Sequence, residues 1–109
     1  MAEEPKDAII ESSGTQTLIK PESETKEPKL YKVVILNDDF TPREFVVHIL
    51  VRFFAKSEAE ATHLMLRVHN QGSGVAGTYS HEIAETKTFQ VNSYSKQNQF
   101  PLKAVMEEA

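Results

Sequence analysis

The chain has 109 residues, no cysteine and a formal net charge of −4, which limit it to one domain and exclude disulfide bonds, thiolate metal sites and a cysteine nucleophile. The negative charge lies in residues 1–28, with seven acidic and three basic side chains, whereas residues 29–109 hold nine of each. A neutral domain without clustered Lys and Arg predicts no nucleic-acid partner, and no apolar run is long enough to span a membrane.

Residues 1–28 are rich in Glu, Lys, Ser, Thr and Pro, with almost no aromatic or periodically spaced apolar residues. Such a segment buries too little surface to offset its chain entropy, so we predict a disordered N-terminal extension. It lacks the charged and apolar regions of a signal peptide, which favours a cytoplasmic protein. Residues 29–109 are predicted to form the folded domain.

The first predicted strand is LYKVVILN, residues 30–37. It is rich in β-branched residues and apolar on both faces, which is typical of a central or well-covered strand. The run breaks off at the polar triplet Asn37-Asp38-Asp39, just before a second dense apolar run.

That second run predicts a helix at residues 43–54. Thr41 is predicted to cap it, with Pro42 at its first position and Glu44 completing the capping pattern. The polar residues of the helix recur every fourth position, which leaves one narrow solvent stripe and an apolar remainder that faces a core.

A second helix is predicted at residues 56–72, where Ser57 and Glu60 have the spacing of a capping box and Gly72 stands where a C-terminal cap belongs. The last three predicted elements are a strand at 73–80, a helix at 81–98 and a strand at 102–108, in which apolar residues alternate.

No catalytic or metal-binding motif survives inspection. The segment HEIAE at residues 81–85 has Glu85 where a zinc-binding helix needs its second histidine. Asp38-Asp39 lacks the alternating ligands and the glycine of a calcium loop, and no serine has a glycine-elbow context. We therefore predict a protein that is not an enzyme and holds no metal or cofactor.

The residues alone leave two interpretations of Asn37-Asp38-Asp39. Asp and Asn commonly start turns and cap helices, so the triplet has a purely structural explanation. Because it stands between two buried segments, it is alternatively a site for a ligand that is part cation and part apolar. His69, near the end of its predicted helix, is either an ordinary partly buried histidine or a group in that site.

Four segments together resemble the ClpS family, the bacterial adaptors that hand N-degron substrates to the ClpA-type AAA+ unfoldase of the ClpAP protease: YKVVILNDDFTPREFVV, ATHLMLRVHNQG, AETK and FPLKAVMEEA. The resemblance covers residues 30–109. It implies an α+β fold of order β-α-α-β-α-β, in which a three-stranded antiparallel sheet packs on three helices, similar to the C-terminal domain of the ribosomal stalk protein. It also implies a binding protein that does no chemistry.

The resemblance further implies roles for individual residues. The α-amino group of a protein that begins with Phe, Tyr, Trp or Leu is expected to bind Asn37, Asp38 and His69. Its first side chain is expected to enter a pocket formed by Ile35, Thr41, Arg43, Val46, Met65, Val68 and Leu102. The unfoldase is expected to dock on Glu82, Thr86 and Lys87.

Arg43 departs from the family, which usually has Met after Thr-Pro. Met forms a soft apolar wall, whereas Arg carries a charged head on an apolar stem. One hypothesis is that Arg43 restricts the ligands to aromatic residues, over whose rings a guanidinium stacks, and weakens Leu binding. The other is that Arg43 points to solvent and changes little.

Three other functions compete with the adaptor. The domain is alternatively a stalk-like interaction module in which the Asn-Asp-Asp triplet is only a turn, or an inactive paralogue that occupies the unfoldase. A small hydrolase using Asp38 and His69 is the third. Binding that depends on a free amine and a large apolar first residue separates the adaptor from the interaction module, whereas the hydrolase predicts turnover that depends on both Asp38 and His69.

Overall fold

The structure is a computed structural model that describes residues 28–109, so the predicted N-terminal extension lies almost entirely outside the described residues. The elements follow the predicted order of strand, helix, helix, strand, helix, strand. Their bounds are β1 Leu30–Leu36, α1 Arg43–Phe54, α2 Glu58–Gln71, β2 Ser73–Ser80, α3 His81–Gln97 and β3 Lys103–Glu108.

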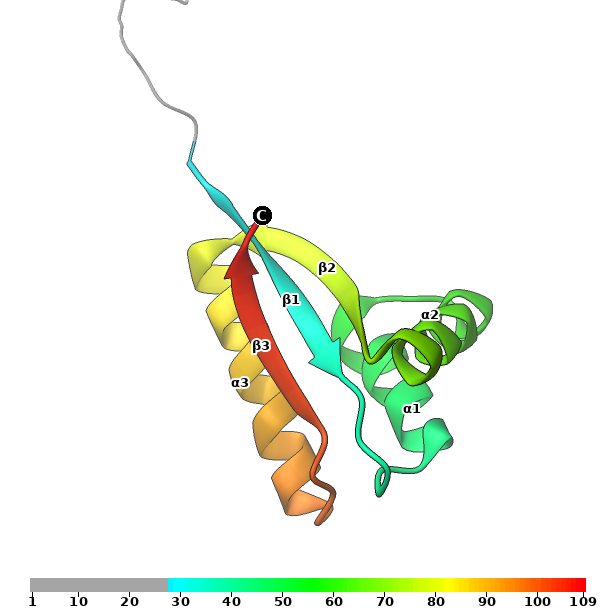
Figure 1. The fold of residues 1–109 in the computed structure, drawn as a ribbon. Helices are drawn as coiled ribbons and strands as arrows, with labels where there is room; N and C mark the ends of the chain where they lie inside the picture. Colours follow the sequence, from blue (N-terminus) through cyan, green and yellow to red (C-terminus); the bar gives the residue numbers. More distant parts are fainter. Residues whose placement is uncertain (1–27) are drawn as a thin grey trace, which may run out of the picture.

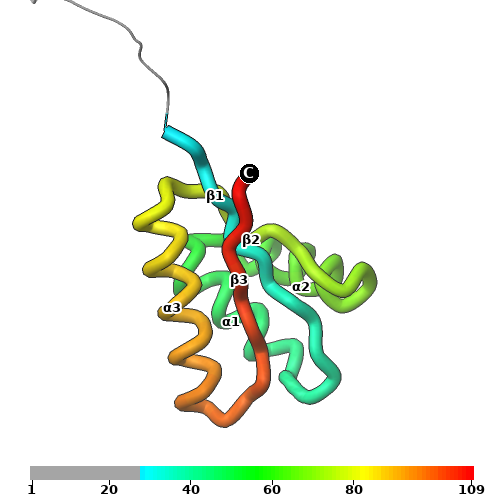
Figure 2. The backbone as a smooth tube through the Cα atoms, turned by 60° about the vertical axis from the view of Figure 1, so that its left-hand side comes forward, coloured from blue at the N-terminus to red at the C-terminus, as the bar shows by residue number. Residues whose placement is uncertain are grey.

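The three strands form one antiparallel sheet in the order β2-β1-β3, with β1 in the centre (Figure 1). β1 pairs Leu30 with Ser80 and Leu36 with Ser73 of β2. Helix α3 packs along β3 and β1, α2 packs against β2, and α1 contacts both α2 and α3 (Figure 2). The predicted α+β fold and the central position of the first strand are thus confirmed.

The core lies between this sheet and the helices. Val33 and Ile35 of β1 are fully buried, as are Ile49 and Leu50 of α1. The solvent stripe predicted for α1 is also present, because Glu44, His48 and Arg52 are all exposed. Burial of one aliphatic side chain contributes about 1.5–3 kcal/mol to folding, so these residues fix how the helices sit on the sheet.

Helix α2 begins and ends as its sequence predicts. The Ser57 side chain accepts a hydrogen bond from the Glu60 backbone N–H, and the Glu60 carboxylate accepts one from the Ser57 N–H. These bonds lower the pKa of Glu60 below its ordinary value. At the other end, Gly72 adopts φ 91°, a left-handed conformation that glycine reaches without strain.

The cap predicted for α1 is wrong. Pro42 precedes the helix, which has no side-chain cap, and the Thr41 hydroxyl instead donates to Asp38 Oδ2 at 2.7 Å. Asp38 lies three residues before Thr41, so its carboxylate competes for the hydroxyl and for the local N–H groups.

A backbone hydrogen bond links the segments that follow β1 and α2. The N–H of Asn37, just after β1, donates to the carbonyl of Gly72, just after α2, at 2.9 Å. It joins the loop after β1 to the end of α2.

Candidate ligand pocket

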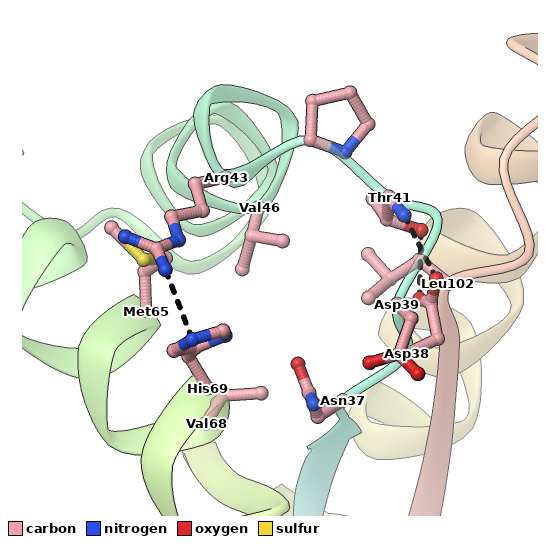
Figure 3. Close-up of a pocket in the computed structure, with 11 residues that line it drawn as sticks. Asn37, Asp38, Asp39, Thr41, Arg43, Val46, Met65, Val68, His69 and Leu102 are labelled. Carbon is pink, nitrogen blue, oxygen red and sulfur yellow. Dashed lines mark hydrogen bonds between the residues drawn. The ribbon is translucent and has the colours of Figure 1, made fainter.

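A cavity of about 240 Å³ opens at this end of the sheet. Four separate parts of the chain form it: the loop after β1, the start of α1, the second half of α2 and the segment before β3. Figure 3 shows the residues that line it: Asn37, Asp38, Asp39, Thr41, Pro42, Arg43, Val46, Met65, Val68, His69 and Leu102.

The apolar wall of the cavity consists of side chains that also belong to the core. Val46 comes from α1, Met65 and Val68 from α2, and Leu102 from the segment before β3. All four are at least 92% buried. Their positions are therefore set by core packing, and the wall is present before any ligand arrives.

The polar wall is organised by Asp38. Its Oδ1 accepts hydrogen bonds from the backbone N–H groups of Phe40 and Thr41, both at 2.8 Å, and its Oδ2 accepts the Thr41 hydroxyl at 2.7 Å. A carboxylate offers about four acceptor sites, two on each oxygen. Oδ1 is filled by the turn, whereas Oδ2 retains one site. Asp38 thus both shapes the turn and lines the cavity, so the two interpretations of the triplet are compatible.

Asn37 and His69 complete the polar side. Figure 3 shows the Asn37 side chain pointing into the space between Val68 and Asp38. His69 lies opposite, in the last turn of α2, and is exposed. Its Nε2 is 2.9 Å from Nη2 of Arg43, which reaches across from the first residue of α1. Arg43 therefore does not simply point to solvent.

The structure brings together the residues predicted for the α-amino site and the side-chain pocket, with the exception of Ile35. That side chain has 0% exposure, belongs to the core cluster and does not line the cavity. Its expected role as a pocket residue stays a prediction. Asp39, which belongs to the polar triplet but was given no role of its own, and Pro42, which was predicted only as part of the helix start, also line the cavity.

The three residues predicted for unfoldase docking lie on α3, at the other end of the molecule. Glu82 and Thr86 are exposed and stand four residues apart, on one face of the helix. Lys87 is partly buried, and its Nζ donates a 2.7 Å hydrogen bond to the Phe53 carbonyl in the last turn of α1. Its amine also lies 5.4 Å from the centre of the Tyr79 ring.

Two other kinds of site are absent from residues 28–109. No helix there has the length and apolar character needed to cross a membrane. The same residues include no group of three or more histidines and acidic side chains arranged to hold a metal ion.

Comparisons with known proteins agree with one another. Residues 26–105 match the family model described as ATP-dependent Clp protease adaptor protein ClpS. The ATP-dependent Clp protease adapter protein ClpS 1 of Rhizobium meliloti is 52% identical over 97 residues, covering 89% of this chain and 83% of the relative. The ClpS adapter of Parvibaculum lavamentivorans is 53% identical over 95 residues, covering 87% and 86%.

A solved structure is also similar. Agrobacterium tumefaciens ClpS2 bound to L-phenylalaninamide superposes with a TM-score of 0.74 at 42% sequence identity. The match covers 76% of this chain and 100% of that protein.

Proposed function

The chain belongs to the family of ClpS adaptors of the ATP-dependent Clp protease, and from this premise we propose that it binds the free N-terminus of proteins beginning with a bulky apolar residue. It then presents them to a ClpA-type AAA+ unfoldase in the bacterial cytoplasm. The observation that carries the proposal is the composition of the cavity, in which Asp38, Asn37 and His69 face a wall of buried apolar side chains.

A free N-terminal residue has one polar and one apolar part, which match the polar and apolar walls of the cavity. Its α-amino group has a pKa of roughly 8 and is mostly a cation at neutral pH. The open acceptor site on Asp38 Oδ2 and the oxygen of Asn37 suit its donors, and charge-assisted hydrogen bonds are the strong kind. Burial of the first side chain against Val46, Met65, Val68 and Leu102 adds about 1.5–3 kcal/mol.

The volume of the cavity limits how much of a ligand it can bind. Sites for drug-sized molecules usually measure about 300–1,000 Å³, and this cavity is smaller, at about 240 Å³. It suits one side chain with its amino group. The ligand in the Agrobacterium ClpS2 structure, L-phenylalaninamide, has a free amino group and a Phe side chain, which are the two features proposed for recognition here.

We also propose that Arg43 narrows the ligand set to aromatic residues, because its guanidinium stands at the cavity, where it can stack on a ring. Binding of Phe- and Leu-initiated peptides to wild type and Arg43→Met tests this point. The Phe preference should shrink in the variant, and an unchanged Phe:Leu ratio would refute it.

Delivery requires that the peptide and the unfoldase bind at the same time. The start of α3, with Glu82 and Thr86, follows the end of β2 that pairs with Leu30, whereas the cavity lies beyond Leu36. These ends of β1 are roughly 20 Å apart, since a strand rises about 3.3 Å per residue. A protein docked on α3 would therefore leave the cavity free.

Fluorescence anisotropy with three labelled peptides tests the proposal. A Phe-initiated peptide should bind, whereas its N-acetylated form and a Ser-initiated peptide should not, because they lack the cation or the apolar side chain. Equal binding of all three would favour a general interaction domain. Binding of none would favour a paralogue that does not recognise N-degrons.

A further inference from the structure

The contact between Arg43 and His69 determines which nitrogen of the His69 ring acts as a hydrogen-bond acceptor. The Arg43 Nη2 and His69 Nε2 atoms are 2.9 Å apart, and they join the first residue of α1 to the last turn of α2 across the cavity (Figure 3). A guanidinium has donors and no acceptor. In this contact the guanidinium therefore donates and His69 Nε2 accepts, which requires the ring tautomer with its proton on Nδ1.

A neutral imidazole has one acceptor nitrogen. An α-ammonium group, like a guanidinium, only donates, so both cations need the same lone pair on His69. They also carry the same charge and would repel each other within the small cavity. The guanidinium and a bound N-terminus thus exclude each other at His69.

We propose that Arg43 is a built-in competitor of the ligand: its guanidinium occupies the His69 acceptor in the empty pocket, and an incoming N-terminus must displace it. The proposal rests on the proposed function, since it concerns the same site. It makes Arg43 a determinant of affinity for every ligand, separate from any stacking on aromatic rings.

The competitor is weak enough to be displaced. Both residues are exposed, and contacts of a charged side chain at the surface contribute little because water and salt screen them. The ligand also gains a hydrogen bond to Asp38 and the burial of its side chain against the apolar wall. Among the described hydrogen bonds, the Arg43 guanidinium has none to Asp38. Removing Arg43 should therefore raise affinity by about 2- to 10-fold.

A double-mutant cycle with Arg43→Met and His69→Ala measures this competition, using a Leu-initiated peptide, which has no ring on which Arg43 could stack. In wild type, binding exchanges one donor for another at His69, so His69→Ala should change affinity less than about threefold. In the Arg43→Met background the acceptor is open, and His69→Ala should weaken binding about 10-fold. The matched control is Arg67→Met, an exposed Arg on α2 that does not line the cavity and should leave binding unchanged.

Nitrogen-15 NMR of the His69 ring supplies an independent measurement. Free wild type should show one tautomer, with the proton on Nδ1, and Arg43→Met should show a mixture. A mixture already in wild type would overturn the proposal, as would additive effects in the cycle or weaker binding by Arg43→Met. If neither wild type nor the folded Arg43→Met variant binds a Phe-initiated peptide, the proposed function itself fails.

Discussion

The double role of Asp38 gives the sharpest prediction, because two substitutions separate its tasks. In Asp38→Asn, the remaining oxygen can still accept the N–H groups of Phe40 and Thr41, and the new amide can donate to the Thr41 hydroxyl, which also accepts. The turn is retained. The Oδ2 acceptor is replaced by a donor, which an α-ammonium group cannot use.

The magnitudes follow from the bonds lost. Asp38→Asn should change the free energy of unfolding by less than about 1 kcal/mol, because the turn keeps its hydrogen bonds. Asp38→Ala loses all three, and by analogy with a lost helix cap it should cost about 1–2 kcal/mol. For binding, loss of a hydrogen bond to a charged group costs about 1.5–3 kcal/mol, so affinity should fall about 10- to 150-fold in both variants.

Urea denaturation and anisotropy with the Phe-initiated peptide measure the two effects on the same samples. Glu85→Gln is the matched control, because it neutralises an exposed carboxylate on α3 that does not line the cavity. It should leave both the stability and the affinity unchanged. If Asp38→Asn binds within threefold of wild type at unchanged stability, Oδ2 is not the partner of the amine and the reasoning fails.

Three further predictions concern packing and backbone. Ala55 ends α1 at φ 55°, a left-handed conformation that costs a non-glycine residue about 1–2 kcal/mol, whereas glycine costs about 0.4–1 kcal/mol in chain entropy. The net gain of about 0.5–1 kcal/mol in Ala55→Gly should raise Tm by roughly 2–8 °C in calorimetry, and a fall would contradict this. The buried Ser95 hydroxyl has no hydrogen-bond partner among the described residues, so Ser95→Ala should stabilise the fold by up to about 1 kcal/mol in urea denaturation, and a loss of stability would contradict this. A Cβ on Gly74 would lie 2.9 Å from Cγ2 of Val68, so Gly74→Ala should push that side chain into the cavity and weaken Phe-peptide binding severalfold, whereas unchanged affinity would show that Val68 can yield elsewhere.

The elements were predictable because their signals are local. The Ser57 and Glu60 capping box and Gly72 lie within one helix, and their hydrogen bonds depend on nothing beyond it. The predicted cap of α1 was wrong although its signal is also local. The Thr41 side chain could either cap the helix or bond to Asp38, and in the structure it bonds to Asp38. Sequence spacing does not rank two feasible hydrogen bonds.

Most of the residues that line the cavity were predictable through the family resemblance, whereas the contacts between them were not. Arg43 and His69 are 26 residues apart, and their contact depends on how α1 and α2 cross. Lys87 likewise reaches the Phe53 carbonyl only because α3 packs beside the end of α1. Ile35 shows the reverse case, since a side chain next to the site in sequence is fully buried in the core.

The groups that line the cavity differ in how well they are positioned for a ligand before it binds. The apolar wall and the Asp38 carboxylate are held by core packing and by the turn, so they lose little freedom when a ligand arrives, which favours affinity. His69 is not available in the same way, because its acceptor nitrogen is already bonded to Arg43. Under the proposed competition every ligand displaces the same Arg43 contact, so the contact lowers all affinities alike. The choice among N-termini then comes from the apolar wall, because a large first side chain gains more from burial than a small one.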